Sequence, residues 1–275
     1  MKAAFNILPD KKENERFHLL IEAGDYGISF SWYASDPLDI KGLSVFNFTG
    51  VSTAAEKANE LENILGLNEI FNEINESVHI CYDFKESILV PAAFYKPGTE
   101  TDLLQLIHDT DNNSIIKSES IADKFNTYAV ENKIESLLLN RFPDAKTHHS
   151  TTLQLQNDFP AGDQLYCIIF HNTIKVILSR DGALQIVQHF SYAGHTDAAY
   201  HLLNCCEQYN LKSTAVTLHL SGLVDTSSML YNELYKYFLN IEFDKIPDGI
   251  TLQERIKFYP LHYFSHLTTL ISCVS

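Results

Sequence analysis

Two stretches of the chain show the same order of hydrophobic and polar positions. Residues 28–32 alternate apolar side chains with serines, and residues 43–48 form a second apolar run. Residues 174–178 alternate in the same way and are followed by an apolar run at 184–192. Alternation with a period of two is typical of a half-buried strand, so each stretch predicts two neighbouring strands.

A further apolar run precedes each alternating stretch. These runs are residues 17–21 and 165–170, and short turns at 22–27 and 171–172 separate them from the strands that follow. Strands joined by so few residues pair antiparallel. Each half of the chain therefore predicts three antiparallel strands in succession.

A helix is predicted after each third strand, at residues 53–65 and 197–209. Apolar residues recur there at helical spacing: Ala54, Ala58, Leu61 and Leu65 in the first, and Ala198, Leu202, Cys205 and Tyr209 in the second. Thr53 with Glu56 three places later predicts a capping box, and Asp197 is a predicted N-cap.

The similarity between the two halves extends to residue identity. Residues 46–55 align with residues 190–199 without an insertion, and both contain two aromatic residues, a glycine and an Ala-Ala pair. The offset is constant from the strand to the end of the helix, which favours an internal duplication over coincidence.

The remaining pattern completes two similar α/β units. Predicted strands are 78–82, 87–90, 115–116, 127–130, 215–220 and 241–243, and predicted helices are 103–107, 131–142, 228–239 and 261–272. Residues 1–16 are interpreted as a polar lead-in. We expect domains at 1–130 and 131–275, each with a mixed five-stranded sheet flanked by helices. A ligand would be expected at the cleft between them.

Charge and cysteine usage restrict the function classes. The formal net charge is −15 in 275 residues, which argues against nucleic acid as a partner because such proteins need a basic surface. The five cysteines form no Cys-x-x-Cys pair, which indicates free thiols in a reducing compartment. Without a signal peptide or a membrane-spanning apolar run, we expect no membrane insertion and a cytoplasmic location.

The duplicated order of strands and helix resembles the actin-like ATPase fold, also called ribonuclease-H-like. Residues 190–203 and 218–222, and Val90-Pro91 ahead of Phe94, further resemble an uncharacterised bacterial family described as having that fold. The resemblance covers nearly the whole chain but implies no particular activity for this family. Known members of the fold include sugar kinases, chaperones, filament proteins and pilus-assembly scaffolds.

The resemblance also implies where a nucleotide site would lie. In actin-like ATPases the first hairpin carries Asp-x-Gly, which matches Glu22-Ala23-Gly24 here. Glu22 is one methylene longer than the expected aspartate, although it could reach a metal ion through water. Asp25 follows where small or hydroxyl residues are usual, and its carboxylate would repel phosphate unless a metal neutralised it.

The second half departs further from the ATPase pattern. Its hairpin has His171 and Asn172 in place of Asp-x-Gly, so it lacks both the carboxylate and a glycine for close approach to phosphate. The adenosine-side Gly-Gly is represented by Gly222 and Leu223. We therefore expect a degenerate nucleotide site with no bound cofactor and no ATPase activity.

Other candidate chemistry has a simpler structural interpretation. His262 and His266 are four apart in a predicted helix and could hold a metal, but no third ligand is evident. His148 and His149 suit a surface position. Cys205, in an adjacent pair mid-helix, suits a buried small apolar side chain.

The sequence thus predicts a non-catalytic scaffold that binds a protein through the cleft or through its tyrosine-rich C-terminal region. The alternative is an ATP-binding phosphotransferase or nucleotide switch in which Glu22, Asp25 and Gly222 perform altered versions of the usual roles. A small-molecule binder is a third possibility.

Overall fold

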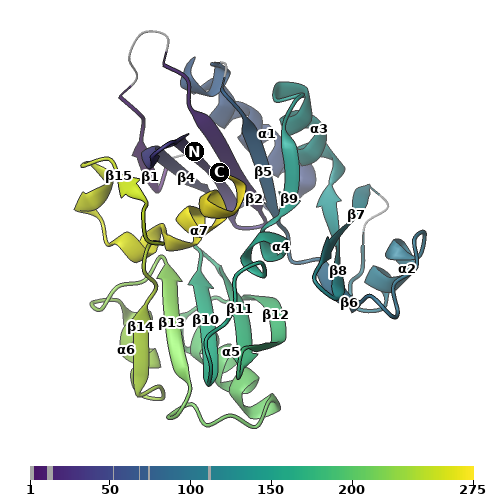
Figure 1. Cartoon of the computed structure of the whole chain (residues 1–275), viewed down its shortest axis with the longest axis vertical. Helices are drawn as coiled ribbons and strands as arrows, with labels where there is room; N and C mark the ends of the chain where they lie inside the picture. The colour runs from purple at the N-terminus through teal and green to yellow at the C-terminus, as the bar shows by residue number, and fades with distance from the viewer. Residues whose placement is uncertain (1–2, 11–14, 52, 68, 74, 111–112) are drawn as a thin grey trace. The chain divides into compact units, whose positions relative to one another are not determined.

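The computed structural model describes residues 3–10, 15–51, 53–67, 69–73, 75–110 and 113–275, and its contacts divide the chain into two compact units (Figure 1). Unit 1 consists of Met1–Gln156, Thr251–Arg255 and Cys273–Ser275, and unit 2 of Asn157–Ile250 and Ile256–Ser272. Residues 131–156, which the sequence assigned to the second domain, lie in unit 1.

Unit 1 is built on a seven-stranded mixed sheet. Its strands are β1 (Phe5–Ile7), β2 (His18–Gly24), β3 (Gly27–Ser35), β4 (Leu38–Asn47), β5 (Val78–Asp83), β9 (Lys146–His149) and β15 (Thr251–Leu252). They are arranged in the order β1-β4-β3-β2-β5-β9, and β15 also pairs with β4. The β2, β3 and β4 strands are antiparallel, whereas β5 and β9 add in parallel.

Unit 2 is built on a five-stranded mixed sheet. Its strands are β10 (Asp163–Ile169), β11 (Thr173–Arg180), β12 (Ala183–Ser191), β13 (Thr217–Gly222) and β14 (Asn240–Phe243). Their order, β12-β11-β10-β13-β14, repeats β4-β3-β2-β5-β9 of unit 1. The directions match too, with three antiparallel strands and two parallel additions.

The repeat extends to an irregularity in the matching strands β4 and β12. Pairing of β3 with β4 skips Lys41, and pairing of β11 with β12 skips Gln185. Such single extra residues are β-bulges. The two bulged residues are 144 positions apart (41 and 185), which is also the offset between the aligned segments 46–55 and 190–199.

Helices pack against the sheets and complete their hydrophobic cores. The α-helices are α1 (Ala54–Gly66), α2 (Glu100–Gln105), α3 (Asn132–Arg141), α4 (Ser150–Gln154), α5 (His195–Gln208), α6 (Met229–Leu234) and α7 (Ser265–Val274). Short 3₁₀ segments are η1 (Glu69–Asn72), η2 (Ile256–Phe258) and η3 (Leu261–Tyr263). Buried residues of α1 and α3 belong to the core of unit 1, and those of α5 and α6 to the core of unit 2. The actin-like architecture predicted from the sequence is present.

Unit 1 contains an insertion that the sequence only partly indicated. Between β5 and α3, strands β6 (Ser87–Pro91), β7 (Ser114–Ile121) and β8 (Lys124–Glu131) form a separate antiparallel sheet in the order β6-β8-β7. The chain enters this insertion at Lys85–Glu86 and leaves it at Glu131. The entry point therefore follows the end of β5, and the exit point directly precedes the start of α3.

Several local predictions can now be compared with the structure. Thr53 and Glu56 form the predicted capping box, in which each side chain accepts a hydrogen bond from the other residue's main chain. Asp197 was wrongly predicted as an N-cap, because α5 begins at His195 with Gly194 as its cap. The lead-in 1–16 contains β1, which pairs with β4. Position 52 of the repeated segment lies outside the described residues.

Candidate functional site

The predicted site residues of unit 1 lie at the end of β2 and in the turn that leads to β3. Gly24 pairs with Gly27 across the hairpin and lies beside Asp83 of the parallel strand β5. A Cβ atom on Gly24 would stand 2.6 Å from the carbonyl oxygen of Asp83. The neighbouring strand thus requires this glycine, whatever ligand the hairpin binds.

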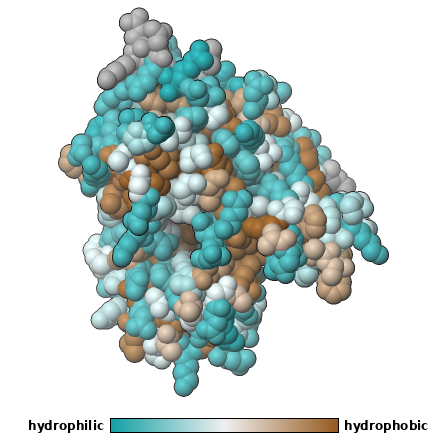
Figure 2. All heavy atoms as spheres, in the orientation of Figure 1, coloured by the Kyte–Doolittle hydropathy of each residue, from teal (hydrophilic) through white to brown (hydrophobic). Residues whose placement is uncertain are grey.

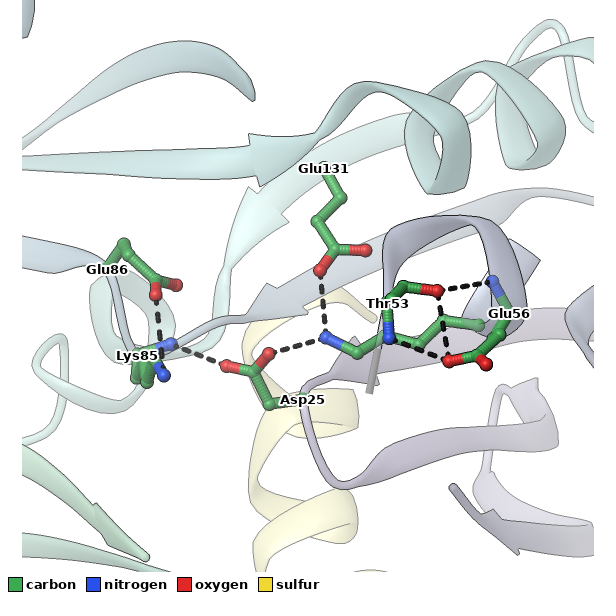
Figure 3. A network of polar contacts seen from close by, with 7 residues as sticks. Asp25, Thr53, Glu56, Lys85, Glu86 and Glu131 are labelled. Atoms are coloured by element: carbon green, nitrogen blue, oxygen red, sulfur yellow. Dashed lines mark hydrogen bonds and ion pairs between the residues drawn. The ribbon is translucent and has the colours of Figure 1, made fainter. Parts of the chain in front are cut away.

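Asp25, in the hairpin turn, is part of an ion-paired network (Figure 3). The Lys57 ammonium lies 2.8 Å from a carboxylate oxygen of Asp25 and 2.8 Å from one of Glu131. The second oxygen of Asp25 accepts a hydrogen bond from the main-chain N–H of Lys85, at 3.3 Å. The network joins the turn, helix α1 and both connections of the insertion.

Lys57 is positioned by the first turn of α1. Its main-chain N–H donates to the carbonyl of Thr53, directly after the capping box. Only 7% of its side chain is exposed, compared with 26% for Asp25 and 23% for Glu131. Burial by itself would lower the pKa of Lys57, but Asp25 and Glu131 outweigh that effect, so the pKa is raised and the ammonium stays charged.

Further acidic groups lie around the same turn. Burial, together with the charge of Asp25, raises the pKa of Glu86. The hydroxyl of Tyr26 donates to Asp83 at 3.3 Å. Burial and the neighbouring carboxylates of Glu22 and Asp83 raise the pKa of Tyr26 well above its usual value. The hairpin is therefore an acidic environment.

This arrangement disfavours phosphate. Two like charges 4 Å apart repel each other by about 4 kcal/mol at an effective dielectric constant near 20. The ammonium of Lys57, which could offset such repulsion, is already shared between the carboxylates of Asp25 and Glu131. Within the described ranges, no group of three or more His, Cys, Asp or Glu side chains is arranged to hold a metal ion. The contacts of Asp25 hold the turn, helix α1 and the connections of the insertion together.

In unit 2, His171 and Asn172 form the exposed turn between β10 and β11. Both main-chain carbonyls accept hydrogen bonds from Tyr192. The Tyr192 hydroxyl donates to the carbonyl of His171 at 3.3 Å, and the Tyr192 main-chain N–H donates to the carbonyl of Asn172 at 3.0 Å. The Asn172 side chain accepts from the hydroxyl of Thr173. These contacts stabilise the turn without providing a carboxylate.

Gly222 ends β13 beside Ile169, the last residue of β10, so the structure brings it to the same end of the sheet as the His171–Asn172 turn. Its φ of +81° lies in the left-handed region. An added Cβ would stand 2.2 Å from the carbonyl oxygen of Ile169. Strand packing therefore accounts for Gly222 without a nucleotide.

Lys57, Lys85 and Glu131 were not identified from the sequence. Lys57 lies 32 positions from Asp25 and 74 from Glu131. No local pattern indicates such a contact, because it depends on where the insertion returns to α3. The capping box was the only nearby signal, since it fixes which residue begins the helix.

The two histidines considered as a metal pair do not share a helix. His262 lies in η3 and His266 in α7, which corrects the predicted helix over 261–272. The imidazole of His262 donates to the carbonyl of Val224 at 2.6 Å and stacks on Phe243 at 4.0 Å. Its contacts are structural.

Unit 2 exposes a set of large apolar side chains, here called the aromatic surface. They are Met229, Tyr235, Tyr237, Leu239, Phe258, Tyr259 and Leu261. Ring contacts continue beneath them, from Tyr235 to Tyr231 at 6.2 Å and from Tyr231 to Phe243 at 5.6 Å. Elsewhere on the molecule, the face viewed in Figure 2 shows hydrophobic areas among mostly hydrophilic side chains. Exposed apolar clusters commonly mark interaction sites.

Solved structures resemble this chain in fold. A Bacteroides thetaiotaomicron VPI-5482 protein with actin-like ATPase fold and unknown function is 18% identical with a TM-score of 0.73, covering 93% of this chain and 96% of that one. A chain of the PilM–PilN type IV pilus biogenesis complex is 12% identical with a TM-score of 0.62, covering 94% and 98%. At these identities the likeness shows the fold alone.

Sequence comparison leads to one family. No curated protein has a significantly similar sequence. No helix in the described part of the chain is both long and apolar enough to cross a bilayer. The family described as "Protein of unknown function (DUF3822)" matches residues 9–241, most of the chain, and the chain belongs to that family.

Proposed function

We propose that this protein is a non-catalytic, protein-binding scaffold of the cytoplasm that keeps the actin-like architecture but has a degenerate nucleotide site. The observation that carries the proposal is the ion-paired state of Asp25. Its carboxylate contacts Lys57 and accepts from the main chain of Lys85, in the turn where the resemblance implies phosphate binding. A phosphate group there would have to displace or repel this carboxylate.

The second hairpin supports the same proposal. His171 and Asn172 supply no carboxylate to organise a metal ion, and their main-chain carbonyls accept from Tyr192. Gly24 and Gly222, the residues that most resemble the ATPase motifs, are each required by a neighbouring strand. Their presence is thus no argument for a retained nucleotide site.

The aromatic surface of unit 2 is the proposed protein-binding site. Aromatic residues and methionine are enriched in interfaces, where they supply large contact areas. Tyr235 is 65% exposed and Phe258 is 83% exposed, so both are available to a partner. A chain of similar fold is part of the PilM–PilN type IV pilus biogenesis complex, and the occurrence of this architecture in that assembly supports the proposal.

Thermal unfolding with and without millimolar Mg-ATP or Mg-ADP tests the nucleotide part. A ligand that binds only the native state adds about 2.7 kcal/mol at a hundredfold excess over its dissociation constant. We expect no saturable rise in the midpoint. A saturable rise that the Glu22→Ala variant abolishes would instead support the ATP-binding phosphotransferase or switch.

The protein-binding part needs a separate measurement. The wild type and a Tyr235→Ser/Leu239→Ser variant are compared by quantitative affinity capture from the source cells. A matched control, Leu106→Ser/Ile107→Ser, removes two equally exposed apolar residues from unit 1. We expect partners to be lost only with the first variant. Equal capture by all three proteins would refute the assignment of the surface.

A further inference from the structure

The insertion of unit 1 is a small sheet with two outer strands (Figure 1). Its order is β6-β8-β7, so β8 is the one neighbour of β7 among the described strands. An outer strand presents main-chain groups that can pair with another chain. At β6 such groups already have partners, because the carbonyl of Ser87 accepts from the imidazole of His108 at 3.3 Å. The carbonyl of Pro91 accepts from the N–H of Phe94 at 2.9 Å, and proline has no N–H to offer.

The register shows which main-chain groups of β7 face away from β8. Just before β7, the carbonyl of Asn113 accepts from the N–H of Asn132 at 3.2 Å, which continues the pairing of β7 with β8. In an antiparallel ladder, alternate pairs exchange hydrogen bonds, so the odd-numbered residues of β7 bond to β8. The N–H of Ala129, which lies opposite Ile116, donates instead to Glu86 beside β6, at 2.9 Å. The main chains of residues 116, 118 and 120 therefore face away from β8.

Two charged side chains of β7 are held in place by contacts within unit 1. The ammonium of Lys117 contacts the carboxylate of Glu135, which is buried. The carboxylate of Glu119 accepts from the main-chain N–H of His149 at 3.0 Å and from the hydroxyl of Tyr128 at 2.6 Å. Because side chains two residues apart in a strand lie on the same face, one positive and one negative charge flank position 118 on that face.

The sequence of β7 is self-complementary. Residues 115–121, here called the edge segment, read Ile-Ile-Lys-Ser-Glu-Ser-Ile. If two copies run antiparallel about Ser118, Lys117 lies opposite Glu119 of the second copy, and Ile115 lies opposite Ile121 of the second copy. Opposite charges and apolar side chains that face each other across neighbouring strands stabilise a sheet. In a chain with a net charge of −15, the edge segment thus offers two copies a contact with one charge of each sign from each copy.

We propose that two copies of the chain associate through antiparallel pairing of their edge segments, with Ser118 on the two-fold axis. The main chain of Ser118 then bonds to Ser118 of the second copy, and that of Ile116 bonds to Ser120 of the second copy. These are the residues whose main chains face away from β8, so the pairing of β7 with β8 is unchanged. The two insertions join into one continuous antiparallel sheet.

Charge substitution at Ser118 tests the arrangement, because the two Ser118 side chains lie side by side at the axis. Sedimentation is measured from micromolar to millimolar protein. We expect the wild type to show a concentration-dependent dimer, and Ser118→Lys and Ser118→Glu each to weaken it at least tenfold. An equimolar mixture of the two variants should restore a dimer, which also shows that both variants are folded. A wild type that stays monomeric throughout, or a dimer that both variants leave unchanged, would overturn the proposal.

Cysteine substitution tests the register independently. Directly opposed residues of a hydrogen-bonded pair have Cα atoms about 5.5 Å apart, within disulfide range. Ser120→Cys is the matched control on the same face of the strand, because two copies of position 120 are separated by four residues, or about 13 Å, along the pair.

Under mild oxidation Ser118→Cys should form a covalent dimer at least tenfold faster than Ser120→Cys. The wild type, in which Cys273 is the one cysteine that is not buried, gives the background rate. Equal rates for the two variants would contradict pairing about Ser118. Neither measurement depends on whether a nucleotide binds or whether the aromatic surface has a partner.

Discussion

Replacing Lys57 with methionine is the most direct test of the ion-paired network. The substitution keeps the length of the side chain and its apolar contacts but removes the ammonium that lies 2.8 Å from both Asp25 and Glu131. The two carboxylates would then face each other without a cation. Because about a quarter of each carboxylate side chain is exposed, water can compensate only part of the loss.

The size of the effect follows from burial and geometry. Removing one partner of a buried ion pair costs about 3–5 kcal/mol, and exposed pairs contribute about 0–1 kcal/mol. Lys57 is nearly buried and its partners are partly exposed, so we expect a loss of about 2–4 kcal/mol in the free energy of unfolding of unit 1. Asp25→Asn should relieve part of this loss, because it removes one of the two charges left uncompensated.

Urea unfolding of the two single variants and the double variant measures this coupling as a double-mutant cycle. Residues in one network couple by about 0.5–3 kcal/mol, whereas independent residues add. Lys124→Met is the control, since its ammonium pairs with Asp123, whose side chain is 78% exposed, and its removal should leave the transition almost unchanged. A loss below about 0.5 kcal/mol for Lys57→Met, or additivity in the cycle, would refute the view that Lys57 holds the turn and the insertion together.

Three further predictions concern local structure. Gly222→Ala should cost more than about 3 kcal/mol or prevent folding of unit 2, whereas Gly249→Ala, with similar φ but open space around it, should cost about 1–2 kcal/mol; urea unfolding compares them. Thr53→Ala should cost about 1 kcal/mol in the same assay through loss of the capping box. Burial and the neighbouring His148 lower the pKa of His79 to about 4, so the unfolded chain binds a proton at this residue more readily than the folded one. The free energy of unfolding should therefore decrease as the pH falls from 6.5 toward 4, and this decrease should be smaller in His79→Gln.

The order of strands and helices was predictable because it depends on local patterns. Alternation of apolar residues located β3 and β11, and the aligned segments 46–55 and 190–199 located the helices after the third strands. The duplication was the strongest signal, since each half supports the interpretation of the other. Short elements such as β1 and β9 were missed because a strand of three or four residues has no periodicity of its own.

The candidate site was less predictable, because its contacts join distant parts of the chain. The resemblance to actin-like ATPases located Glu22, Gly24 and Asp25 in the first hairpin and indicated that a carboxylate at position 25 is unusual there. It did not indicate which cation compensates that carboxylate. Lys57 lies in the first turn of α1 and Glu131 ends the insertion, and only the folded unit brings them to Asp25.

The two glycines show why a conserved-looking motif is weak evidence for a ligand. Gly24 and Gly222 are the residues that most resemble nucleotide-binding positions, yet each lies where a Cβ would collide with the carbonyl of the adjacent parallel strand. The close approach belongs to the sheet itself, so the glycines would persist after a nucleotide was no longer bound. The carboxylates carry more information about function, because they are the groups that would meet a metal ion or repel phosphate. Under the proposed function, Asp25 paired with Lys57, and His171 where the resemblance implies a second carboxylate, are the positions that distinguish a scaffold from an ATPase.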